Sequence, residues 1–114
     1  MMEHDQIREA VLRMMAPFDD EYWRACDRDH RFPEEFRQAV VDAGWLGIAV
    51  PEAFGSSGLG VREGVVLMES IANSPGAMSA ASSVHMDVFG PKAITHHGSD
   101  EQKAKYLPEI ISGR

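Results

Sequence analysis

His85 has the most suggestive setting of the residues in this sequence that could do chemistry. It lies in a stretch rich in small residues, Ala77 to Phe89, and its helical face includes Ser82, Met86 and Phe89, because these residues follow i, i+3, i+4 and i+7 spacing. Small side chains allow either another helix or a ligand to approach closely. Spacing alone slightly favours a packed core face with one hydrogen-bonded histidine over a ligand-binding face.

The remaining reactive residue types form no recognisable catalytic or metal-binding pattern. No two histidines have the i, i+4 spacing that places two metal ligands on one helix face, so we expect no metal site. His96 and His97 are expected near a helix end, where an imidazolium interacts favourably with the helix dipole. The single cysteine, Cys26, cannot form an internal disulfide and is expected to be a small buried residue in a reducing compartment. The scattered carboxylates identify no general base, and we assign no catalytic residue.

The segment Gly55 to Gly60 has the composition of a phosphate-binding loop and precedes a predicted helix. Its glycines follow the pattern G-x-x-G-x-G, however, and no strand unit surrounds them. Turns favour the same residue types. We therefore predict a plain turn here, with a phosphate-binding loop as the less favoured alternative.

Length and charge restrict the class of protein. A chain of 114 residues fits one small domain or one piece of a larger protein. The net charge of −7, with no basic stripe, argues against a nucleic-acid partner. No apolar run approaches the roughly 20 residues of a membrane-spanning helix. The first residues lack the apolar core of a secretory signal.

Helical periodicity organises almost the whole chain, and we predict an all-α bundle of about five or six helices. The apolar stripe from Ile7 to Cys26 keeps its phase through Pro17, which predicts one kinked helix or two helices stacked nearly end to end. Further helices are predicted after Pro33, over 61–72, over 77–89, with a turn or two over 92–97, and from the capping box of Ser99 and Gln102. The last of these is expected to be interrupted at Pro108.

Two features divide these helices. Gly44 is expected to end one helix with a positive φ, and Trp45 to Val50 is an apolar run too short for a helix of its own. After the glycine-rich segment, the apolar face of the next helix is predicted to consist of Val61, Val65, Met68, Ile71 and Ala72.

Three segments resemble, in the right order, the N-terminal helical domain of the acyl-CoA dehydrogenases. They are Phe32–Pro33 with Phe36 and Asp42 to Glu52; then Phe54 to Gly60; and finally Ile94, His97 to Lys103, Lys105 to Pro108 and Ser112–Gly113. The resemblance covers essentially the whole chain. It departs at Ser56–Ser57, where the family more often has paired glycines before the serine, which affects the turn and not the chemistry.

The resemblance implies a three-domain, FAD-dependent enzyme that oxidises the α,β C–C bond of an acyl-CoA thioester. A carboxylate base would take the α proton and the flavin would accept the β hydride. Residues 1–114 would be the N-terminal domain, inactive alone, while a middle β-barrel and a last helical domain beyond Arg114 would hold the base and most flavin contacts. Electron-transfer flavoprotein as partner, a homo-oligomer and a cytoplasmic location are further expectations.

The resemblance also changes the interpretation of the small-residue helix. In the family, the helix before the glycine and the Glu-Gln-Lys segment lines the end of the acyl pocket, which by position implies Ser82, His85, Met86 and Phe89 as substrate-binding residues. A pocket wall is then favoured over plain packing. His85 and Phe89 would shorten the pocket, which indicates a short or branched acyl chain.

Two alternatives stay open. Acyl-CoA oxidases, nitroalkane oxidases and related flavin monooxygenases share this N-terminal domain and would differ in the other domains. A helical interaction module without a cofactor would instead be a folded monomer with no large apolar patch. A domain of a larger enzyme would expose apolar surface for its neighbours, and we expect Trp45 to Val50 to be part of that surface.

Overall fold

The computed structural model describes residues 3–55 and 58–114, which contain α-helices, two short 3-10 helices and no strand. The α-helices are α1 (His4–Met15), α2 (Asp20–Arg28), α3 (Glu34–Asp42), α4 (Val61–Ala72), α5 (Ala77–Phe89), α6 (Pro91–His97) and α7 (Asp100–Ile111), and the 3-10 helices are η1 (Trp45–Gly47) and η2 (Glu52–Phe54). The all-α prediction is confirmed. The described part holds seven α-helices rather than five or six, because the chain divides at Pro17 and again at Gly90–Pro91.

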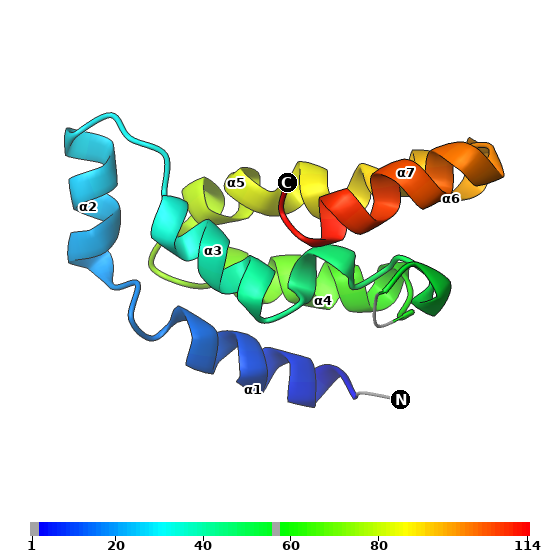
Figure 1. Ribbon diagram of the computed structural model, residues 1–114. Helices are drawn as coiled ribbons and strands as arrows, with labels where there is room; N and C mark the ends of the chain where they lie inside the picture. The colour runs from blue at the N-terminus through cyan, green and yellow to red at the C-terminus, as the bar shows by residue number, and fades with distance from the viewer. Residues whose placement is uncertain (1–2, 56–57) are drawn as a thin grey trace.

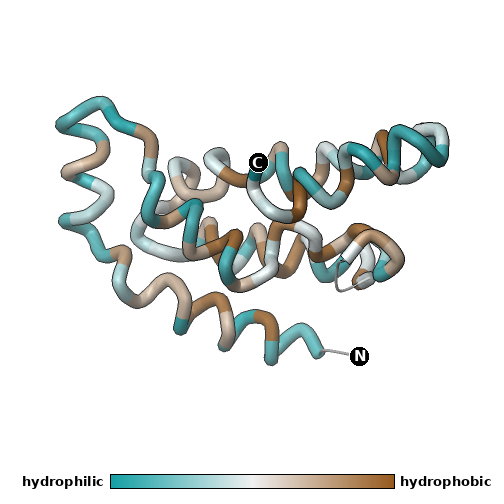
Figure 2. The backbone as a smooth tube through the Cα atoms, viewed as in Figure 1, coloured by the Kyte–Doolittle hydropathy of each residue, from teal (hydrophilic) through white to brown (hydrophobic). Residues whose placement is uncertain are grey.

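The helices form a flat slab with extents of 44 × 31 × 19 Å. Helix α1 packs against α4, α4 packs against α5, and α6 and α7 pair with each other (Figure 1). The apolar residues of Figure 2 gather on α1, on α4 and on the segment that follows α3, whereas α2 is mostly hydrophilic. Within the described ranges, no helix is both long enough and apolar enough to cross a membrane.

The stripe around Pro17 forms two helices, but they are not stacked end to end. Helix α2 runs across the ends of its neighbours in Figure 1. The carboxylate of Asp19 accepts a hydrogen bond from the Tyr22 amide at 3.0 Å and so starts a new helix. Phe18 turns inward, and its carbonyl accepts a hydrogen bond from the Trp23 indole at 3.0 Å. These two contacts fix a change in chain direction between α1 and α2, which the unbroken helical periodicity of the apolar residues did not predict.

The segment Trp45 to Val50 is buried, so its predicted role as exposed docking surface is wrong. Gly44 adopts φ = +79° as predicted and turns the chain back beneath α3, α5 and α7. The amide of Leu59 donates to the Ile48 carbonyl at 2.9 Å, and the Gly58 amide donates to the Val50 carbonyl at 3.1 Å. The segment therefore joins the core of the domain instead of waiting for a partner.

Helix α7 confirms one predicted signal and corrects another. The capping box is present, since Ser99 Oγ accepts from the Gln102 amide at 3.1 Å and Gln102 accepts from the Ser99 amide at 2.9 Å. The predicted interruption at Pro108 is wrong, because α7 continues to Ile111. Pro108 removes one amide donor on an exposed turn, while its own carbonyl still accepts from the Ser112 amide at 3.1 Å.

Four aromatic rings join α2 to α3 and the turn before α2. Phe36 stacks edge-on against Phe18 and Trp23, with ring centroids 5.6 and 5.2 Å apart, and Tyr22 packs edge-on against Phe18 at 5.0 Å. The Tyr22 hydroxyl accepts a hydrogen bond from the Phe36 amide at 3.3 Å. Burial raises the pKa of Tyr22 to about 12, even though this amide hydrogen bond opposes the rise.

The raised pKa of Tyr22 predicts a loss of stability at high pH. The tyrosine of the unfolded chain ionises near pH 10, whereas folded Tyr22 holds its proton to about pH 12. Its contribution is therefore complete below pH 10 and is lost as the pH rises through that window. Urea unfolding at successive pH values measures this loss, and Tyr22→Phe is expected to flatten it. An equally steep decline in the variant would contradict the assignment.

Candidate functional site

An open apolar groove of about 590 Å³ runs between α4 and α5. Helix α4 contributes one wall and α5 the other. The lining residues are Val65, Met68, Glu69, Ala72, Met78, Ala81, Ser82, His85 and Phe89. Met78 and Val65 keep 71% and 50% of their surface exposed. The groove therefore presents apolar side chains to whatever occupies it.

Three of the four residues predicted on the face of His85 meet in this groove. Ser82, His85 and Phe89 line it, whereas Met86 lies outside it and is 68% exposed. The opposite side of α5 enters the core through Ala80, Val84 and Val88. One face of α5 thus packs against helices, and another face lines the groove.

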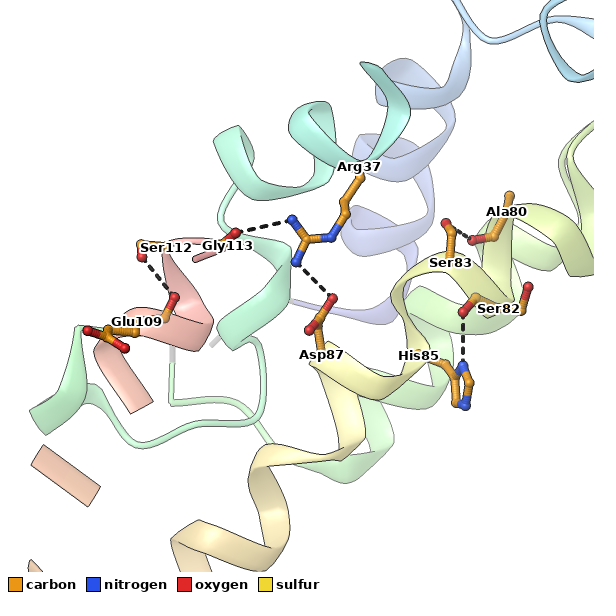
Figure 3. Close-up of polar contacts among 9 residues, drawn as sticks. All are labelled: Arg37, Ala80, Ser82, Ser83, His85, Asp87, Glu109, Ser112 and Gly113. Carbon is orange, nitrogen blue, oxygen red and sulfur yellow. Dashed lines mark hydrogen bonds and ion pairs between the residues drawn. The ribbon is translucent and has the colours of Figure 1, made fainter. Parts of the chain in front are cut away.

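The hydrogen-bonding side chains of α5 that line the groove are bonded to their own helix. His85 Nδ1 lies 3.1 Å from the carbonyl oxygen of Ser82 (Figure 3). Because a carbonyl only accepts, Nδ1 carries the proton, and Nε2 of a neutral ring is left as an acceptor. Ser82 Oγ donates to the Ser79 carbonyl at 3.3 Å. The α5 wall therefore offers few free donors, which suits an apolar ligand.

The sequence pattern did not predict that α4 forms a wall of the groove. Helix α4 has two apolar faces, and the predicted face combined residues from both. The core face of α4 consists of Val66, Leu67 and Ile71, with Gly64 and Ser70 buried beside them. Val65, Met68 and Ala72 lie on the groove, and Val61 next to them is 47% exposed. Only Ile71 of the predicted face belongs to the core. The sequence does contain a signal for this second apolar face, because apolar residues recur at intervals of four, three and four residues. They are Val61, Val65, Met68 and Ala72.

An ion pair holds α5 on the side away from the groove. The guanidinium of Arg37 on α3 lies 3.1 Å from the carboxylate of Asp87 and also donates to the Gly113 carbonyl at 3.2 Å (Figure 3). Both side chains are mostly buried, so these bonds are screened less than surface pairs. Arg37 therefore links α3, α5 and the turn after α7.

The other candidate sites carry less chemistry. The N-terminus of α4 lies next to an acidic side chain, since Glu63 Oε2 is 3.4 Å from where a Cβ of Gly60 would be, which disfavours a phosphate there. Ser56 and Ser57 of the same loop lie outside the described residues. Cys26 is a free, buried thiol as predicted, and His96 and His97 end α6. Within 3–55 and 58–114, no three His, Cys, Asp or Glu residues are grouped to hold a metal ion.

The fold and the groove together define a small helical domain with an open apolar groove between two adjacent helices. Sequence comparison gives the family. The family model described as "Acyl-CoA dehydrogenase, N-terminal domain" matches residues 1–114, and the chain belongs to the acyl-CoA dehydrogenase family as this N-terminal domain.

Curated relatives agree with this assignment. The chain is 33% identical over 113 residues to "Isovaleryl-CoA dehydrogenase, mitochondrial" of Pongo abelii, with 97% of this chain and 26% of the relative covered. It is 36% identical over 87 residues to "Acryloyl-CoA reductase (NADH)" of Anaerotignum propionicum, with 76% and 22% covered. It is 28% identical over 113 residues to "Acyl-CoA dehydrogenase" of Bacillus subtilis (strain 168), with 99% and 28% covered.

The chain thus spans about a quarter of the length of these relatives. No solved structure matches it.

Proposed function

We propose that this chain is the N-terminal domain of an FAD-dependent dehydrogenase that oxidises the α,β C–C bond of an acyl-CoA thioester, and that the groove between α4 and α5 binds part of the acyl chain. The observation that carries the proposal is the apolar groove itself, lined by Ser82, His85 and Phe89 in a domain of this family. Apolar walls bind an alkyl chain by removing it from water, with about 0.8 kcal/mol for each buried CH₂.

The flavin and the catalytic base are assigned to parts of the enzyme other than this domain. The N-terminus of α4, which follows the glycine-rich segment, does not suit a flavin pyrophosphate, because the Glu63 carboxylate lies beside it. The relatives are about four times longer than this chain, which leaves room for the cofactor in their remaining length. The role of this domain is then to position the acyl chain, which in turn places the Cα–Cβ bond.

The substrate is proposed to be a short or branched acyl-CoA. The imidazole of His85 and the ring of Phe89 occupy groove volume that a longer chain would need. The similarity to proteins named isovaleryl-CoA dehydrogenase supports the same direction. Electron-transfer flavoprotein as acceptor and a homo-oligomeric enzyme complete the proposal and rest on the family alone. A cytoplasmic location is proposed with them, and the relatives include both mitochondrial and bacterial proteins. The reactivity of the reduced flavin with oxygen separates a dehydrogenase from an oxidase.

Ser82→Leu tests the proposed acyl site. The added isobutyl group is expected to fill part of the groove, so that kcat/KM falls for the longer acyl-CoA substrates and stays nearly constant for the shortest. The loss of two buried methylenes corresponds to about a fifteen-fold decrease. Steady-state kinetics of the flavin-loaded enzyme with straight chains from butanoyl-CoA to dodecanoyl-CoA measure the profile.

Ser79→Leu is the matched control, since it makes the same change on the same helix at an exposed residue outside the groove. Its profile is expected to match that of the unmodified enzyme. Equal profiles for both variants would reject the acyl site, and full-length enzyme purified without bound flavin would reject the dehydrogenase itself.

A further inference from the structure

Gly64 occupies an unusual position for a glycine. It lies inside α4, is buried, and does not have a positive φ. Glycine is a poor residue for the interior of a helix, and nothing in the backbone at this position requires its conformational freedom. The reason for a glycine here must therefore come from what packs against it.

The contact at Gly64 is the ring of Phe89 on α5. A Cβ added to Gly64 would lie 3.3 Å from Phe89 Cε1, 3.8 Å from Phe89 Cζ and 3.8 Å from Val88 Cγ1. The first distance is shorter than an ordinary contact between carbon atoms, so one of the two groups has to move. Val88 is 1% exposed and enclosed in the core, whereas Phe89 is only partly buried and borders the open groove.

We infer that Gly64 sets the depth of the acyl groove without touching the ligand. The bare backbone of α4 gives the Phe89 ring a place to lie, and any larger residue at position 64 displaces the ring in the direction that offers space, which is into the groove. Gly64 is thus a positioning residue for chain-length specificity. This inference rests on the proposed function, because the groove must first hold an acyl chain.

Gly64→Ala is the test, with acyl-CoA thioesters from butanoyl to dodecanoyl titrated into the protein by calorimetry. Affinity for the unmodified protein is expected to rise with chain length to a plateau. In the variant, the plateau is expected about one carbon earlier, with about fourfold weaker binding of the longer chains and unchanged binding of the shortest. Gly64→Ala combined with Phe89→Leu is expected to restore the original plateau, because the smaller side chain leaves room for the new methyl group.

The outcomes separate the inference from the function on which it rests. A plateau in the unmodified protein that Gly64→Ala leaves in place, or an equal loss at every chain length, overturns the role of Gly64 and leaves the acyl site standing. Affinity that does not depend on chain length in the unmodified protein overturns both. Thermal unfolding of each variant shows whether a uniform loss comes from destabilisation.

Discussion

Phe36→Ala is expected to destabilise the domain by about 3–5 kcal/mol, the usual cost of removing a fully buried aromatic side chain. Phe36 is 0% exposed and contacts the rings of Phe18 and Trp23 edge-on. These contacts attach α2 and the turn before it to α3. A domain of this size has a total stability of roughly 5–15 kcal/mol, so the variant is expected to be close to unfolding.

Urea unfolding followed by circular dichroism measures this effect. Phe32→Ala is the matched control, because it makes the same change four residues earlier, where the ring is 45% exposed. We expect the control to cost less than about 1 kcal/mol, as surface substitutions usually do. A similar cost for the two variants would show that the aromatic cluster does not hold α2 in place.

Phe89→Ala is expected to produce the largest change in substrate preference. Removal of the ring lengthens the groove at the end that Phe89 borders, so chains too long for the unmodified enzyme gain binding surface. Each methylene that enters is worth about fourfold in kcat/KM, and three of them correspond to about a sixty-fold gain. The shortest substrates are expected to lose activity, because the groove no longer fits around them.

The same acyl-CoA series measures this shift, with Phe32→Ala again as control, since Phe32 lies away from the groove. A uniform decrease for all chain lengths in Phe89→Ala would mean that Phe89 supports the fold of α5 and not the specificity of the site. Thermal unfolding of the variant distinguishes a destabilised enzyme from one with an altered pocket.

Local signals in the sequence predicted most of the helices and several of their ends. The capping box of Ser99 and Gln102 and the positive φ of Gly44 depend only on neighbouring residues, and both are present. Pro108 shows the limit of such signals, because a proline removes a single donor and the remaining bonds of α7 tolerate it. The change of direction before α2 depends on a contact between Trp23 and Phe18 that periodicity does not report.

Burial was harder to predict than secondary structure, because it depends on which elements meet. The apolar run from Trp45 to Val50 was expected at the surface, yet Gly44 turns it beneath α3, α5 and α7. Helix α4 has apolar residues on two faces, and only the packing of α1 and α5 shows that Ile71 faces the core while Val65 and Met68 face the groove.

The candidate site was therefore half predictable. Spacing on α5 brought together Ser82, His85 and Phe89, which line the groove, whereas Met86 of the same predicted face lies outside it. The wall from α4 and the role inferred for Gly64 require the distance between two helices, which no single-helix pattern contains.

The most direct test of the acyl site is to locate the end of a bound acyl chain. An acyl-CoA with a photoreactive diazirine at its terminal carbon is bound to the protein and irradiated, and the labelled residues are identified by mass spectrometry. We expect the label on the groove walls, at Ser82, His85 or Phe89 on α5 or at Met68 on α4. Excess unlabelled substrate is expected to prevent it. Competed labelling confined to residues outside the groove would contradict the proposal that this domain holds the acyl chain.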